Sequence, residues 1–149
     1  MKDIPESEAL SKLNSPKCCV DCSWQPLRTP SYSMIASVGL IDSNGARIGL
    51  IAELIYQNHP LVGTTTYKFG VFSQHPWGLQ RVYMLEIRQF KKSIKNTHQL
   101  PHEHIGDKRV NGSDIWATWG YYDVLKHFCN RTNITFDPDL LAPTAFELI

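Results

Sequence analysis

Three of the six histidines in this 149-residue chain fall within seven residues, at positions 98, 102 and 104. Imidazole is the side chain whose ordinary pKa lies closest to neutrality, so grouped histidines are candidates for acid–base chemistry or metal binding. For His102 and His104 the backbone decides what is possible. Residues two apart point to the same face of a strand, whereas on a helix they diverge by about 200°. The element that carries this segment therefore determines whether both rings can act on one ligand.

Positive charge lies on both sides of the histidine segment. The stretch upstream has no acidic residue and four basic ones: Arg88, Lys91, Lys92 and Lys95. Cleavage of RNA through its 2′-hydroxyl needs a base, an acid and a cation near the phosphate. We expect His102 and His104 to act as acid and base, Arg109 as the cation, and Lys108 to help hold the phosphate. The upstream basic run would bind the RNA backbone, so a ribonuclease or an RNA-binding protein is the leading hypothesis.

A metal-dependent hydrolase is a second possibility for the same segment. His102 and His104 on a strand, together with His98 and either Glu103 or Asp107, would supply enough donors for a catalytic zinc. However, the sequence lacks an HExxH motif, and we expect neither a metal nor a cofactor.

A non-enzymatic interaction module is the third possibility, in which the histidines are simply solvated. Such a protein would use Trp77, Trp116 and the basic run to bind a cognate protein partner. The sequence has no dinucleotide-binding GxGxxG motif, no phosphate-binding GxxxxGK[ST] loop and no GxSxG nucleophile elbow. These absences remove the best-known nucleotide and serine-hydrolase signatures.

Composition predicts one ordinary globular domain. Hydrophobic residues make up 42% of the chain and charged residues 19%, and the formal net charge is only +1. Any nucleic-acid binding must therefore depend on a local patch rather than on the whole-protein field. The polar N-terminus is unlike a secretory signal and no apolar stretch could span a bilayer, so we expect a cytoplasmic protein without membrane contact.

The segments that would position the histidines predict a series of strands. Apolar or alternating stretches cover 34–41, 47–56, 66–72 and 81–87, separated by turn signals such as Asp42-Ser43-Asn44-Gly45. Consecutive strands joined by short turns predict an antiparallel meander. The 47–56 stretch is apolar at both parities, so we expect it to be buried on both faces.

Asn111-Gly112 is the strongest short hairpin signal, and we expect strands at 105–110 and 115–119 on its two sides. This places His102 and His104 on or just before a strand that turns back at Asn111. An amphipathic helix follows over 121–130, and its apolar stripe contains Tyr121, Val124, Leu125 and Phe128.

The predicted fold is α+β: an antiparallel sheet of about five or six strands packed on a C-terminal helix. Residues 1–30 form an irregular lead-in with a short helix at Glu6–Leu13, residues 31–134 form the sheet and helix, and residues 135–149 form a tail. The lead-in also carries Cys18, Cys19 and Cys22, which we interpret as reduced thiols rather than a zinc site.

This layout resembles a loose group of small, largely uncharacterised bacterial and phage proteins with a strand meander, an H-x-H segment and a C-terminal helix. The matching pieces lie between Ile35 and Ile134: Tyr67-Lys68-Phe69, Arg81-Val82-Tyr83, Pro101 to Asp107, and the helix through Leu125, Phe128 and Cys129. Some members of that group are toxins of toxin–antitoxin pairs. The resemblance implies the same layout here, and it makes the ribonuclease expected from the histidines and basic residues a toxin-like one.

Overall fold

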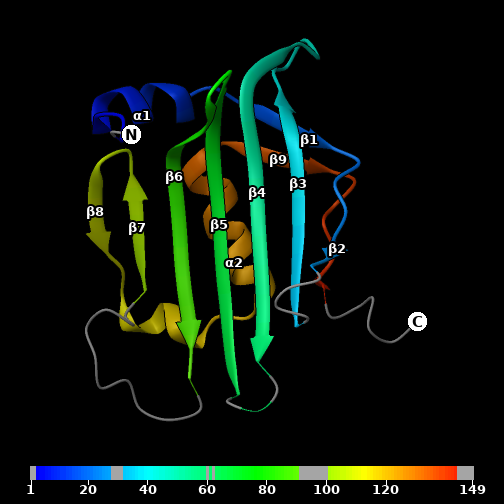
Figure 1. The fold of residues 1–149 in the computed structure, drawn as a ribbon, viewed down its shortest axis with the longest axis vertical. Helices are drawn as coiled ribbons and strands as arrows, with labels where there is room; N and C mark the ends of the chain where they lie inside the picture. Colours follow the sequence, from blue (N-terminus) through cyan, green and yellow to red (C-terminus); the bar gives the residue numbers. More distant parts are fainter. Residues whose placement is uncertain (1–2, 28–31, 60, 62, 91–100, 144–149) are drawn as a thin grey trace.

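The computed structural model describes residues 3–27, 32–59, 61, 63–90 and 101–143. An antiparallel meander forms the centre of the sheet (Figure 1), and its strands neighbour one another in chain order. They are β3 (Ser33–Ile41), β4 (Arg47–His59), β5 (Thr64–His75), β6 (Gly78–Gln89), β7 (His102–Ile105) and β8 (Lys108–Asn111). The antiparallel arrangement predicted from the sequence is confirmed.

Within the described residues the sheet has nine strands instead of the expected five or six, because three lie outside the meander. These are β1 (Lys17–Val20), β2 (Gln25–Pro26) and β9 (Ile134–Asp137). β1 pairs in parallel with β9, where Lys17 lies opposite Ile134, while β2 pairs with β3. The expected lead-in and tail therefore both contribute strands. They are strands only because segments far apart in the sequence pair with each other.

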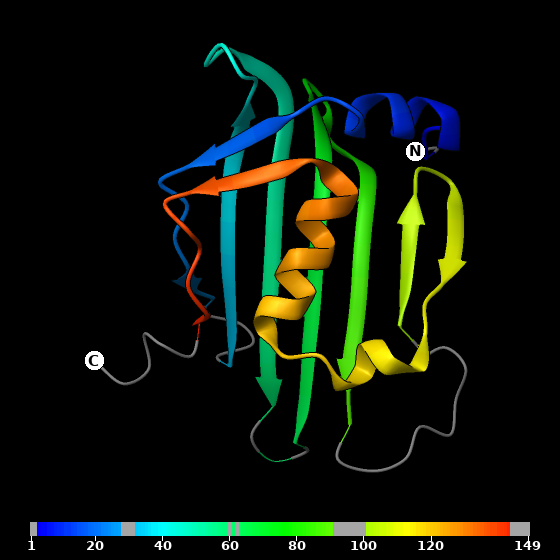
Figure 2. The ribbon, with the colours of Figure 1, turned by 180° about the vertical axis from the view of Figure 1, so that it is seen from behind.

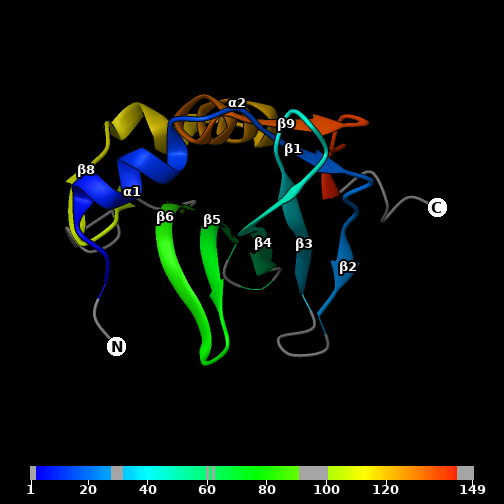
Figure 3. The same ribbon diagram turned by 90° about the horizontal axis from the view of Figure 1, so that it is seen from above.

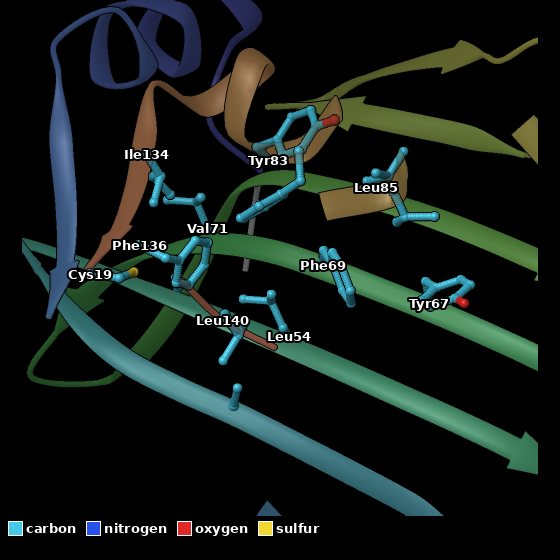
Figure 4. Packing of buried hydrophobic residues seen from close by; sticks show 14 of the residues in the cluster. Cys19, Leu54, Tyr67, Phe69, Val71, Tyr83, Leu85, Ile134, Phe136 and Leu140 are labelled. Atoms are coloured by element: carbon cyan, nitrogen blue, oxygen red, sulfur yellow. The ribbon is translucent and has the colours of Figure 1, made fainter. Parts of the chain in front are cut away.

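Helix α2 (Tyr121–Thr132) packs on one face of this sheet, as expected for the C-terminal helix (Figure 2). Its buried Tyr121, Val124 and Phe128 repeat at helical spacing and face the sheet. The ring of Phe128 lies 5.8 Å from that of Phe69 and 6.0 Å from that of Tyr83, measured between centroids. Figure 4 shows these two sheet residues among the buried side chains of β5 and β6.

The opposite face of the meander, here called the open face, carries no covering helix or strand among the described residues. Viewed from above, α1 (Glu6–Leu13), α2, β1 and β9 all lie on the other side (Figure 3). Leu50 and Leu54 of β4 are buried toward α2, whereas Ile51 and Ile55 on the open face are only partly buried. The expectation that this strand is buried on both faces was wrong, because only one side has a second layer.

The turn that follows the histidines also differs from the prediction. β7 and β8 are joined at Gly106 and Asp107, not at Asn111-Gly112. Gly106 has a φ of 58°, and a Cβ there would lie 2.5 Å from the carbonyl oxygen of Ile4, so the position requires glycine. The expected strand at 115–119 is instead the 3₁₀ helix η2 (Asp114–Thr118). Because the contact with Ile4 joins segments far apart in the sequence, a local turn signal could not reveal it, and the turn was predicted at Asn111-Gly112 instead.

Neither described helix is a membrane-span candidate, since both are too short and too polar to cross a bilayer.

Candidate nucleic-acid interface

The structure brings His102, His104 and Arg109 together on the open face. His102 and His104 alternate along β7 with Glu103, whose side chain points to the α2 side. The two imidazole rings meet edge to face, with their centroids 5.0 Å apart. Arg109 lies directly opposite His104 in the ladder between β7 and β8, so it shares the same face.

Glu86 joins this group, and sequence reasoning missed it. It lies opposite His102 in the ladder between β6 and β7, and its Oε2 is 3.3 Å from His102 Nε2. Its Oε1 is 3.8 Å from Lys68 Nζ and 3.4 Å from Arg88 Nη2. The hydrogen bond with His102 lowers the pKa of Glu86 to about 2, against the effect of burial and with help from the nearby cations. Alternation placed Glu86 on one face of its strand, but its partners depended on register.

His104 lies among positive charges. Burial, together with the positive charges of Arg81, His102 and Arg109, lowers the pKa of His104 to about 4. Arg81 is itself held by Asp3, with Nη2 at 2.9 Å from Oδ2. His104 is therefore neutral at pH 7 and presents a ring that can donate or accept a hydrogen bond without carrying charge.

Four basic side chains from β5, β6 and β8 thus lie on the same face as the two histidines. We call this group the cationic row, and its members are Lys68, Arg81, Arg88 and Arg109. Two carboxylates, Glu86 and Asp3, form ion pairs with three of these cations. Positive charge is in excess along the row, although the formal charge of the whole chain is only +1.

Of the remaining predicted binding residues, Lys108 is described by the structure and does not join the row. Lys108 is paired with Ile105 in the ladder, and its Nζ forms an ion pair of 3.4 Å with Glu6 of α1. It therefore lies on the side of the sheet that carries the helices. Lys91, Lys92 and Lys95 lie outside the described residues, as does His98.

A second charged group, also missed from the sequence, lies on the α2 side. The carboxylate of Glu103 is 1% exposed and accepts a hydrogen bond of 2.5 Å from the Tyr83 hydroxyl. Arg131 of α2 donates from Nε at 3.1 Å and from Nη2 at 3.3 Å, and His127 Nε2 lies 3.3 Å away. Burial would raise the pKa of Glu103, but the hydrogen bonds from His127 and Tyr83 and the charge of Arg131 leave it lowered.

Two tryptophans pack beside this group, and one of them, Trp116, was expected to bind a protein partner. Trp116 and Trp119 stack on each other with centroids 5.3 Å apart, and both contact the ring of His127 at 4.6 Å and 5.3 Å. Gln89 of β6 also donates to the Trp119 carbonyl oxygen. These contacts tie η2 to α2 and to the end of β6, so we assign this cluster a structural role.

A cavity of about 670 Å³ lies between α2 and β9, away from the cationic row, and Cys129 is among its lining residues. All four cysteines are free thiols. Within the described ranges, no three or more His, Cys, Asp or Glu side chains are grouped so that they could hold a metal ion.

No protein-family model, no curated protein and no solved structure matches this chain. The resemblance to small bacterial and phage proteins, some of which are toxins, therefore stays a prediction. What can be argued about function comes from the side chains on the open face.

Proposed function

We propose that this protein binds single-stranded RNA on the open face of its sheet, along the cationic row. The observation that carries the proposal is the row itself: Lys68 on β5, Arg88 on β6 and Arg109 on β8 share a face that no described element covers. Basic side chains that neutralise phosphates release counterions, which drives binding to nucleic acid. A partly apolar sheet face also suits unpaired bases, whose faces are stacked inside the helix in a duplex.

The basic run supports this reading through its covalent position. β6 ends at Gln89, directly after Arg88, and the next residues include Lys91, Lys92 and Lys95. Lys95 is seven positions after Arg88, and an extended chain spans at most about 3.6 Å per residue, or roughly 25 Å here. All three lysines are therefore within reach of an RNA strand that passes over Arg88.

The histidine geometry favours binding over cleavage. His102 is 5% exposed, and its ring contacts that of His104 edge to face, so no phosphodiester fits between the two rings. In this proposal Glu86 fixes the ring of His102, and His102 in turn supports His104. The neutral His104 then offers a nitrogen to a phosphate oxygen or a 2′-hydroxyl, and Arg109 supplies the charge. Cleavage of RNA with His102 and His104 as acid and base stays a prediction, and the RNA samples described below also test it.

Fluorescence anisotropy with a labelled single-stranded RNA, titrated at several NaCl concentrations, tests the proposal. We expect Arg88→Gln and Arg109→Gln each to weaken binding several-fold and to reduce the salt slope by about 0.7. Lys108→Gln is the matched control, because it removes the same charge from the other side of the hairpin. Equal effects of all three changes, or binding of a protein partner without any binding of RNA, would contradict the proposal.

The same samples can be examined for RNA cleavage on a denaturing gel. The geometry leads us to expect intact RNA. Cleavage that is present in the wild type and absent in His104→Gln would instead make the protein a ribonuclease at this site.

A further inference from the structure

A hollow of about 210 Å³ lies on the open face where β4 and β6 end and β5 begins. Its lining residues come from these three strands and from the residue before β3: Tyr32, Gln57, His59, Thr64, Thr66 and Arg88. Arg88 belongs to both the hollow and the cationic row. Its Nη2 lies 3.4 Å from Oε1 of Glu86, the carboxylate that also pairs with Lys68 of the row. The hollow is therefore the end of the row and not a separate region.

Strand register builds the floor of this hollow. Gln57 lies opposite Thr66 in the ladder between β4 and β5, and Thr66 lies opposite Arg88 in the ladder between β5 and β6. His59 and Thr64 form the next pair along β4 and β5. An amide, two hydroxyls and a guanidinium thus line one small space, and its lining includes no acidic side chain.

Two rings form one side of the hollow. Tyr32 and His59 lie with their centroids 4.5 Å apart at an angle of 50°. The backbone holds them together, since Asn58 N donates a 3.3 Å hydrogen bond to the Tyr32 carbonyl oxygen. Aromatic and imidazole rings are the usual stacking surfaces for unpaired bases in RNA-binding proteins.

We propose that this hollow receives one unpaired base of the RNA strand that the cationic row binds, an inference that rests on the proposed function. Its volume is below the roughly 300 Å³ at which pockets for drug-sized ligands begin, so it suits a single ring system. The Tyr32 and His59 rings stack on the base, and Gln57, Thr64 and Thr66 hydrogen-bond to its edge. Arg88 holds the adjoining phosphate and leads the strand onto the row. The protein thereby prefers one base over others at this position.

Binding of labelled octamers of uridine, adenosine and cytidine, compared by anisotropy at one salt concentration, tests this inference. We expect the best and worst octamer to differ by about fivefold or more. Gln57→Ala and Thr66→Ala should remove most of that preference, while the salt slope stays at its wild-type value. Gln74→Ala, the same change as the first variant but at an exposed position near the far end of β5, should leave the preference intact.

The stacking contribution has its own pair of variants. Tyr32→Phe keeps the ring and should bind the preferred octamer as the wild type does, whereas Tyr32→Ala should weaken it by about fivefold. Thermal melting of each variant establishes that it is folded before its binding is compared.

Failure of this inference can be distinguished from failure of the proposed function. Equal affinity for the three octamers, with binding still dependent on Arg109, would overturn the base site and leave RNA binding standing. The same holds if Gln57→Ala and Thr66→Ala keep the wild-type preference. Absence of binding to any octamer would overturn both.

Discussion

The hydroxyl of Tyr83 on β6 donates a 2.5 Å hydrogen bond to Glu103 on β7, a carboxylate buried beneath α2. Arg131 and His127 reach the same carboxylate from α2. One buried anion therefore connects two strands and the helix. Glu103 lies on the face of β7 opposite to His102 and His104. Its contacts with α2 therefore hold in place the strand that carries the two histidines.

Removing this carboxylate is expected to destabilise the fold. Glu103→Gln removes the buried charge that Tyr83 and the half-exposed Arg131 contact, and weakening hydrogen bonds to a charged group costs about 2 kcal/mol. Tyr83→Phe removes one hydrogen bond and should cost about 1–2 kcal/mol in the free energy of unfolding. Urea denaturation followed by circular dichroism measures both. Glu53→Gln, the same chemical change on the open face, should stay within about 0.5 kcal/mol, and an equally small effect at Glu103 would contradict this account.

Stability should fall as the solution is acidified through the range in which His104 resists protonation. The pKa of His104 is about 4 in the folded protein, against an ordinary value of 6.5. Below pH 6.5 the unfolded chain takes up a proton that the folded chain refuses, so stability is lost progressively down to about pH 4. We expect a loss on the order of 1 kcal/mol at pH 5 after solvent screening, and a shallower pH dependence in His104→Gln. Urea midpoints at pH 7, 6 and 5 check this, and identical profiles for the two proteins would refute it.

Glu86→Gln is expected to strengthen RNA binding. Glu86 is ionised at neutral pH, because its pKa is about 2, and it offsets the charges of Lys68 and Arg88. Removing one negative charge from the row should raise the affinity about threefold at low salt, and the gain should shrink as NaCl is added. Anisotropy measures it. Weaker binding in this variant would mean that Glu86 serves mainly to hold His102 in place.

Gly112→Ala should displace Trp116 and loosen η2. A Cβ at Gly112 would overlap the indole ring of Trp116, which has Trp119 and His127 against it. We expect a shift in tryptophan fluorescence and a loss of about 1–3 kcal/mol in stability, the cost of forcing an extra carbon into packed side chains. Gly39→Ala is the control, since its Cβ would meet nothing within 4 Å. A Gly112→Ala protein with wild-type fluorescence would contradict the placement of Trp116.

Local periodicity was sufficient for much of the fold. Alternation of apolar residues predicted β3 to β6, and helical spacing predicted α1 and α2, because both patterns are written within a few residues. Alternation also predicted that His102 and His104 share a face, once a strand was assumed. None of these inferences needed to know which strand neighbours which.

Register and long-range packing decided the rest. β1 near the start of the described chain pairs with β9 near its end, and no local sequence pattern predicts this pairing. The position of the turn at Gly106 depends on the backbone of Ile4, and the pairing of Lys108 with Glu6 depends on where α1 lies. Each of these errors in the prediction comes from a contact between segments far apart in sequence.

By itself the sequence determined that two histidines alternate along a strand within a basic region, since side-chain direction and charge are local properties. Only the tertiary structure decided their surroundings. Strand register placed Glu86 opposite His102 and Arg109 opposite His104. It also placed Arg88 opposite Thr66, which lies opposite Gln57. Lys108 lies on the other face of the sheet. A shift of one residue in any of these ladders would turn those side chains to the opposite face of the sheet.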